Sequence, residues 1–352
     1  MKIAVIGGGG WGTALAALLA GKGHEVRLWV FEEDLAERMR ATRENDRFLP
    51  GVPVPPQVAI TSRLAEAAAG AECCLLVTPS HALRAVASRL VAEAPGAVAS
   101  FRTIVIATKG LEPETLKRMS EVVGEVLSGA GSGASGGPGG AAAAPVVLAG
   151  PSHAEEVARG IPTAVVAASR DRARAAEVQQ TFSTDAFRVY TNDDVVGVEI
   201  AVALKNVVAV AAGLSDGLGF GDSTKGALLT RGLVEISRLG AALGARPETF
   251  WGLAGLGDLV ATATSRHSRN RRLGEAVGKG ATLAEALAAS PMVAEGVQTA
   301  RAAVSLAKLH NVELPIAEQV RAILFEGKSA RDALRELLAR DLKSEDQTMA
   351  RR

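Results

Sequence analysis

The first half of the chain alternates short, continuously apolar runs with longer segments rich in Ala, Leu, Glu and Arg. The runs predict buried strands and the segments between them predict helices. Because the runs are apolar throughout rather than at every second position, we expect an α/β fold with a parallel sheet covered by helices on both faces. The predicted strands are Ile3–Ile6, Val26–Val30, Cys73–Val77, Thr103–Ala107, Val146–Leu148 and Ala164–Val166.

From about Asp193 the pattern changes to long helical periodicities joined by Gly-rich connections. The chain is also longer than a single hydrophobic core usually allows. We therefore expect two domains, an α/β domain over residues 1–192 and an all-helical domain over residues 193–352. The helical segments that the periodicity predicts are Lys225–Leu243, Thr282–Ala288, Ala300–Leu309 and Ile316–Leu324.

The longest apolar stretch, Val195–Leu214, approaches membrane-spanning length. It contains Glu199, Lys205 and Asn206, which are costly in hydrocarbon. We interpret it as a buried helix, not as a membrane span.

Residues 128–144 contain only Ser, Gly, Ala and Pro. Such a segment buries too little apolar surface to offset its ordering entropy, so we expect a mobile surface loop. Deletion of Gly129–Ala143 should then leave activity intact. Loss of activity in a still-folded protein would make the loop functional.

Composition limits the kinds of ligand that the protein is expected to bind and the compartment in which we expect it. Lys and Arg total 39 against 38 Asp and Glu, so no excess of charge points to nucleic acid. The two cysteines, Cys73 and Cys74, are adjacent within an apolar run and have neither zinc nor disulfide spacing, so we expect reduced core residues and no metal site. The N-terminus lacks the pattern of a signal peptide, which favours a cytoplasmic protein.

A glycine-rich turn lies between the first predicted strand and a predicted helix, Thr13–Leu19. Residues 7–12 supply G-x-G-x-x-G, in which Gly7 permits a tight turn, Gly9 lets a pyrophosphate approach the backbone, and Gly12 allows close helix packing. In this context the motif indicates a Rossmann-like, doubly wound domain that binds a nicotinamide dinucleotide. The competing interpretation is a glycine turn that binds nothing.

The end of the second strand should select between NAD and NADP. Glu32 either accepts a hydrogen bond from the ribose 2′-hydroxyl, which favours NAD, or is a charge at a helix N-terminus. Positions 30–33 contain no Arg or Lys, although Arg27 and Arg38 can reach in from elsewhere. This pattern leans towards NAD and leaves NADP open.

Lys205 is the leading candidate for proton transfer. It lies in a helical segment that is apolar on every face, so its ammonium must be desolvated or enter a polar cavity, and its pKa should fall towards neutrality. A lysine that extends along an apolar surface to water is the common alternative, but Leu204, Val207 and Val208 leave no evident wet side. Asp258 lies in another apolar stretch and needs a cationic partner, for which Lys205 is suitable.

Further polar groups follow strands or begin helices. Ser268, Arg269 and Asn270 lie at a probable helix start and suit a phosphate, whereas Arg271 and Arg272 fit equally well on a solvated face. Lys109 and Ser152 follow two of the predicted strands, where open α/β sheets bind ligands. We assign no acid or base role to His153, because Lys205 already fills it.

Seven motifs in order resemble the bacterial NAD(P)-dependent glycerol-3-phosphate dehydrogenases, from Met1 to about Leu338. They are Ile6–Leu15, Thr78–His81, Ala107–Glu112, Gly150–Ser152, Ala203–Val207, Ala254–Leu259 and Ser268–Arg272. The resemblance implies reversible reduction of dihydroxyacetone phosphate to sn-glycerol 3-phosphate for glycerophospholipid synthesis. It also implies a cytoplasmic homodimer that has no membrane span and binds no nucleic acid.

The resemblance also implies roles for individual residues, with Lys205 as the group that exchanges the proton. The residues implied to hold the sugar phosphate are Lys109, Gly150, Ser152, Lys205, Asp258, Ser268, Arg269 and Asn270. Those implied to contact the cofactor are Gly10, Trp11, Lys109, Ala154, Arg269, Val293 and Glu295, beside Gly7, Gly9, Gly12 and the position of Phe31.

Three departures from the family pattern concern the cofactor site and one loop. Gly10 stands where the family often has Ser, and Phe31 where it often has Arg or His that recognises a 2′-phosphate. The 128–144 segment is longer than the usual connection.

Two other functions remain open from the residues. One is a related two-domain hydroxyacid or hydroxyacyl dehydrogenase, against which Ser268–Asn270 argues. The other is a non-catalytic dinucleotide sensor, against which Lys205 and Asp258 argue.

Overall fold

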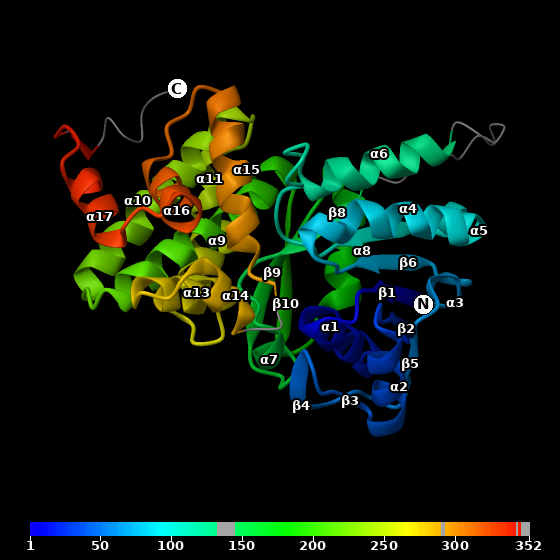
Figure 1. Ribbon diagram of the computed structural model, residues 1–352. Coiled ribbons are helices and arrows are strands. Elements are labelled where there is room, and N and C mark those ends of the chain that lie inside the picture. The colour runs from blue at the N-terminus through cyan, green and yellow to red at the C-terminus, as the bar shows by residue number, and fades with distance from the viewer. Residues whose placement is uncertain (132–144, 290–292, 343, 346–352) are drawn as a thin grey trace. The chain divides into compact units, whose positions relative to one another are not determined.

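The computed structural model describes residues 1–131, 145–289, 293–342, 344 and 345. Their contacts divide the chain into two compact units (Figure 1). The first comprises Met1–Thr108 and Met119–Asp193, and the second comprises Lys109–Arg118 and Asp194–Arg352. The sequence pattern had no feature that separates Lys109–Arg118 from the sheet. Most of the 128–144 segment lies outside the described residues.

The first unit is built on one eight-stranded sheet. In spatial order its strands are β10 (Phe187–Asn192), β9 (Thr163–Ala168), β8 (Val146–Ala149), β7 (Thr103–Ile106), β6 (Cys73–Leu76), β1 (Lys2–Ile6), β2 (Glu25–Trp29) and β5 (Val58–Thr61). Two short strands, β3 (Glu44–Asn45) and β4 (Leu49–Pro53), pair antiparallel beside it. The six predicted strands are all present.

Helices cover both faces of this sheet, which confirms the predicted fold class. One face packs against α1 (Gly10–Gly21), α2 (Glu33–Thr42) and α8 (Arg172–Phe182). The other packs against α3 (Leu64–Ala68), α4 (Leu83–Glu93) and α6 (Met119–Gly131). Shorter helices are the 3-10 turn Ser80–Ala82, α5 (Pro95–Ser100) and α7 (Ala154–Val157). Cys73 and Cys74 contribute to opposite faces and are free and buried, as predicted.

Three details differ from the sequence prediction. The sheet is not wholly parallel, because β8 and β9 pair antiparallel. Helix α6 extends to Gly131, so the first four residues of the segment expected to be a loop are helical. The edge strands β5 and β10 were missed because each has exposed positions among its buried ones, so neither is a continuously apolar run.

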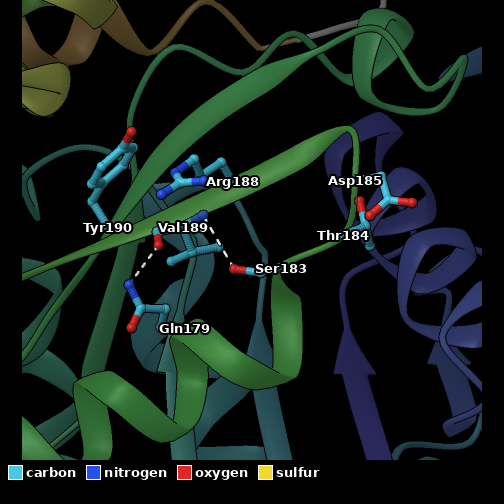
Figure 2. Close-up of a pocket in the computed structure, with 7 residues that line it drawn as sticks. All are labelled: Gln179, Ser183, Thr184, Asp185, Arg188, Val189 and Tyr190. Atoms are coloured by element: carbon cyan, nitrogen blue, oxygen red, sulfur yellow. Dashed lines mark hydrogen bonds between the residues drawn. The ribbon is translucent and has the colours of Figure 1, made fainter.

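The outer edge of β10 is closed by side chains from the end of α8 and the turn after it (Figure 2). Val189 donates its backbone N–H to Ser183 Oγ at 3.3 Å and accepts from Gln179 Nε2 at 2.8 Å. Thr184 satisfies both backbone groups of Phe187. The surface pocket of about 500 Å³ beside these residues therefore borders a protected sheet edge.

The second unit is helical, as predicted. Its helices are α9 (Val195–Gly217), α10 (Asp222–Ala242), α11 (Pro247–Phe250), α12 (Asp258–Thr264), α13 (Arg269–Gly278), α14 (Leu283–Ala288), α15 (Glu295–Leu309), α16 (Pro315–Glu326) and α17 (Ala330–Leu338). A π-helical turn, Leu253–Gly257, leads into α12.

Helix α9 is the centre of the second unit. In the part of the chain that the structure describes, it is the one helix long and apolar enough to cross a membrane. Its most apolar window is 89% buried among its neighbours, however, which is typical of a core helix.

Glycines allow α9 and α13 to touch through their backbones. A Cβ on Gly213 of α9 would lie 2.0 Å from the carbonyl oxygen of Arg271. A Cβ on Gly274 of α13 would lie 2.1 Å from the carbonyl oxygen of Val210. This close approach brings the N-terminus of α13, with Ser268, against the middle of α9.

Candidate functional site

The glycine turn of the first unit has the form that a dinucleotide site requires. Gly7 has φ +132°, and a Cβ there would lie 2.4 Å from the Val77 carbonyl oxygen. A Cβ on Gly12 would lie 1.8 Å from the Gly7 carbonyl oxygen, so helix α1 can begin here only with glycine at this position. A Cβ on Gly9 would meet none of the described atoms within 4 Å, which leaves this part of the backbone open to a ligand.

Two observations show that the turn fits a pyrophosphate. The N-cap residue of α1 is Gly9, which has no side chain to cap the first turn, so the N–H groups and positive dipole of this turn suit an anion. The buried indole N–H of Trp11 also has no hydrogen-bond partner among the described residues. When bound, the dinucleotide would be held by residues 7–12.

Asn45 holds the glycine turn in place and was missed from the sequence. Its fully buried amide donates to the Gly8 carbonyl oxygen and to Thr13 Oγ1, both at 2.8 Å, and accepts from Phe48 N at 2.9 Å. Because Asn45 lies in the two-residue strand β3, about thirty positions after the glycines, no local pattern marked it.

The end of β2 carries the groups expected to choose the cofactor. Phe31 is 67% exposed and lies edge-on to Trp29. Glu32 occupies the N-cap position of α2 without a side-chain cap and lies 3.7 Å from Arg47. Arg27 donates to two backbone carbonyl groups, and Arg38 pairs with Asp34 and Asp46. Both arginines that the sequence left open for a 2′-phosphate are thus engaged elsewhere in the first unit.

The segment after β8 also lies close to the glycine turn. Gly150 has φ +138°, and Ser152 Oγ donates to its carbonyl oxygen at 3.0 Å. Ala154 begins α7, and its Cβ lies 3.7 Å from the place where a Cβ on Gly10 would stand. The structure therefore brings Gly10 and Ala154 together, while His153 is the N-cap residue of α7.

The second unit contains a buried cluster of charges around Asp258. This carboxylate begins α12 directly after the π-helical turn and is 1% exposed. Lys205 of α9 donates to its Oδ1 at 2.5 Å, and Lys109 donates to its Oδ2 at 3.1 Å. The pairing of Lys205 with Asp258 agrees with the sequence prediction, and Lys109 joins them through the segment that belongs to this unit.

Burial and charge set the protonation of this cluster. Desolvation lowers the pKa of Lys205 to about 7, with Asp258 opposing the shift and Lys109 and Arg269 adding to it. Burial by itself raises the pKa of Asp258, but the two ammonium groups outweigh burial, and the net shift is downward. Lys205 can therefore gain and lose a proton near neutral pH beside a carboxylate that stays ionised.

Thr262 completes the surroundings of Lys205 and was also missed. Its hydroxyl accepts a hydrogen bond from Lys205 Nζ at 2.6 Å and is buried. Thr262 lies one helical turn after Asp258 on α12, so both side chains face α9. That i, i+4 spacing was the available signal in the sequence.

The predicted phosphate cluster divides into different roles. Ser268 is the N-cap of α13 and accepts from Arg271 N at 3.2 Å. Arg271 pairs with Asp216 at 2.7 Å and its side chain is mostly buried, so it does not lie on the solvated face that the sequence offered as an alternative. Arg269 is near enough to Lys205 to lower its pKa.

Asn270 is tied to two other elements of the second unit. Its Nδ2 donates to Asn206 Oδ1, and its Oδ1 accepts from Gly296 N, each at 2.9 Å. These bonds fix the start of α15, where Glu295 is the first residue and Val293 lies just before it, 37% exposed.

Comparison with known proteins shows the same family along both halves of the chain. Residues 2–175 match the NAD-dependent glycerol-3-phosphate dehydrogenase N-terminus, and residues 194–335 match the C-terminus of that family. A protein of Geobacter sulfurreducens named glycerol-3-phosphate dehydrogenase (NAD(P)+) is 52% identical over 345 residues, which are 98% of each chain. A protein of the same name from Citrifermentans bemidjiense is 51% identical over 344 residues, also 98% of each chain.

A solved structure agrees with these relatives. The crystal structure of glycerol-3-phosphate dehydrogenase from Coxiella burnetii superposes with a TM-score of 0.87 at 38% identity, covering 96% of this chain and 99% of that one. This chain belongs to the NAD-dependent glycerol-3-phosphate dehydrogenase family.

Proposed function

We propose that this protein reversibly reduces dihydroxyacetone phosphate to sn-glycerol 3-phosphate with NADH or NADPH, and so supplies the backbone of glycerophospholipids. The observation that carries the proposal is the buried Lys205, held by Asp258 and Thr262, with a pKa near 7. The relatives that carry this activity in their names are about half identical to it over nearly the whole chain.

Lys205 is the proton-transfer residue in this proposal. The nicotinamide supplies or accepts the hydride when bound. As the carbonyl is reduced, the ammonium of Lys205 gives a proton to the substrate oxygen, and in the reverse direction the neutral amine removes it. Asp258 and Thr262 orient the Lys205 side chain, because both accept hydrogen bonds from Nζ.

The remaining site residues hold the two ligands. In the second unit we assign Lys109, Asp258, Ser268, Arg269 and Asn270 to the sugar phosphate, and in the first unit Gly150 and Ser152. Their cations and helix N-termini suit a phosphate. The cofactor-binding residues are proposed to be Gly7, Gly9, Gly10, Trp11, Gly12, Phe31, Lys109, Ala154, Arg269, Val293 and Glu295.

Residues 1–192, apart from Lys109–Arg118, which pack with the helical unit, are proposed as the dinucleotide-binding domain, and residues 193–352 are proposed as the substrate-binding domain. A cytoplasmic homodimer is proposed because the bacterial enzymes that the sequence resembles are of this kind. The order of cofactor preference is proposed to be NAD before NADP, because a carboxylate just after β2, that of Glu32, would repel a 2′-phosphate.

The test is the disappearance of NADH or NADPH absorbance when purified protein meets dihydroxyacetone phosphate. We expect consumption of at least one cofactor, and none with unphosphorylated dihydroxyacetone at the same concentration. No consumption of either cofactor would overturn the assignment. A large preference for NADPH would overturn the cofactor order alone.

A further inference from the structure

The segment Lys109–Arg118, here called the strap, leaves the sheet unit after Thr108 and returns to it at Met119. It packs within the second unit, where Leu111 is 1% exposed in the core formed around α9. A ten-residue excursion of this kind must be anchored, because its backbone belongs to neither the sheet nor a helix.

Internal hydrogen bonds give the strap a fixed shape. Glu112 N donates to the Lys117 carbonyl oxygen at 2.9 Å, and Leu116 N donates to the Glu112 carbonyl oxygen at 2.8 Å. Leu111 and Arg118 form an antiparallel bridge, so the two ends of the strap lie side by side. Leu116 has φ +61°, a conformation that side chains other than glycine adopt only when the surroundings enforce it. We therefore expect a shift at one end of the strap to reach the other.

Both ends of the strap form ion pairs with buried carboxylates. At the first end, Lys109 reaches Asp258. At the second end, Arg118 donates to Glu199 of α9 at 2.8 Å, with side-chain exposures of 16% and 4%. Glu199 lies on the same helix as Lys205, so the second ion pair ties the strap to the helix that carries the proposed proton-transfer residue.

We infer that the Arg118–Glu199 pair is a positioning device that sets where the Lys109 ammonium lies in the substrate site. Neither residue is among those proposed to touch substrate, and the pair acts through the strap. The inference rests on the proposed function only where it predicts weaker binding of the substrate. If the pair were merely structural, its loss would lower stability without moving Lys109.

Loss of the pair should weaken substrate binding more than turnover. Removal of Arg118 takes away the ion pair by which the second end of the strap is held to Glu199 of α9 at 2.8 Å, so we expect the strap to shift. We expect Arg118→Met to raise KM for dihydroxyacetone phosphate about tenfold, with kcat changed less than about threefold. Glu199→Gln keeps the volume and one acceptor oxygen, so it should give a smaller rise.

The decisive measurement is the same substitution in a Lys109→Met background. If Arg118 acts through Lys109, Arg118→Met adds no further rise in KM there. A full additional rise in that background would overturn the inference. Arg340→Met is the matched control, because Arg340 pairs with Glu313 at 2.8 Å in the same unit but at an exposed site.

A second readout follows Lys109 without any activity. The rate at which acetic anhydride labels Lys109, measured by mass spectrometry, should rise several-fold in Arg118→Met and Glu199→Gln and stay unchanged in Arg340→Met. An unchanged rate in both strap variants would overturn the inference. If the unaltered protein fails to turn over dihydroxyacetone phosphate, the proposed function falls, and the labelling still decides whether the pair positions Lys109.

Discussion

Lys205 changes its protonation state near neutral pH, so the rates of the two directions of the reaction should depend on pH in opposite ways. With a pKa of about 7, the free enzyme holds more neutral amine as the pH rises. We expect kcat/KM for oxidation of glycerol 3-phosphate to rise through about pH 7 and kcat/KM for the reduction to fall there. Lys109→Met should move both midpoints upward, because the Lys109 charge helps to lower the pKa of Lys205.

Lys205→Met tests the assignment of this group. Turnover should fall by roughly 10²-fold or more, while the affinity for NADH, measured by fluorescence titration, stays within about threefold. Near-normal turnover would move the proton-transfer role elsewhere, and His153 would be the next residue to test.

Arg269 should distinguish a phosphorylated from an unphosphorylated substrate. Arg269→Ala should raise KM for dihydroxyacetone phosphate about 30-fold or more, because a cation beside a phosphate forms charge-assisted hydrogen bonds. The loss in kcat/KM should be smaller for dihydroxyacetone itself. Equal losses for both would show that Arg269 does not recognise the phosphate.

Among single residues, the sequence identified charged side chains that lie within apolar stretches. Lys205 and Asp258 stood out as charges in apolar stretches, and the structure joins them at 2.5 Å. Asn45 and Thr262 could not be found in the same way, because a polar residue does not stand out in a segment that already contains polar residues. Their importance comes from contacts with residues far away in the chain.

At the scale of elements, the contact between α9 and α13 depends on glycine. Gly274→Ala would place a Cβ 2.1 Å from the Val210 carbonyl oxygen, and a helix backbone cannot yield as a side chain can. We expect the free energy of unfolding to fall by about 2 kcal/mol or more. Chemical denaturation provides the measurement.

Gly226→Ala is the matched control on α10. Gly226 is exposed, and a Cβ there would meet no described atom within 4 Å. That substitution should stabilise the protein by up to about 1 kcal/mol, because alanine favours a helix. Equal effects at the two positions would contradict a role for close helix contact.

Periodicity located most elements but not their contacts. The predicted strands and helices reflect continuous local patterns, such as the apolar run of β6 or the long repeat in α10. The short strand β5 and the alternating strand β10 carry weaker patterns. The antiparallel pairing of β8 with β9 and the place of the strap are decided by packing between distant segments, which a local pattern does not contain.

For the whole molecule, Glu235 makes stability depend on pH. Its carboxyl accepts from Ile316 N at 2.8 Å at the start of α16, and burial raises its pKa to about 8. Below the unfolded-state pKa of 4.5 the group is neutral in both states. As the pH rises from there to about 8, only the unfolded chain ionises readily, so stability is lost.

Glu235→Gln should remove this loss while keeping an acceptor for α16. We expect the variant to gain stability relative to the parent between pH 5 and 8, reaching on the order of 3 kcal/mol. Denaturant unfolding at several pH values gives the difference. A difference that stays constant over this range would show that Glu235 is ionised in the folded protein.

The burial of α9 has a consequence for synthesis. The helices that cover it, α10, α12, α13, α15 and α16, all follow it in the chain. While the ribosome is still adding those helices, a stretch apolar enough to enter a bilayer is without its cover. The interval lasts until about Glu326 has emerged, and during it the nascent chain is open to chaperones and to the membrane-targeting machinery. The same helix that carries Lys205 therefore makes folding of the second unit depend on the translation of residues 222–326, which contain the covering helices.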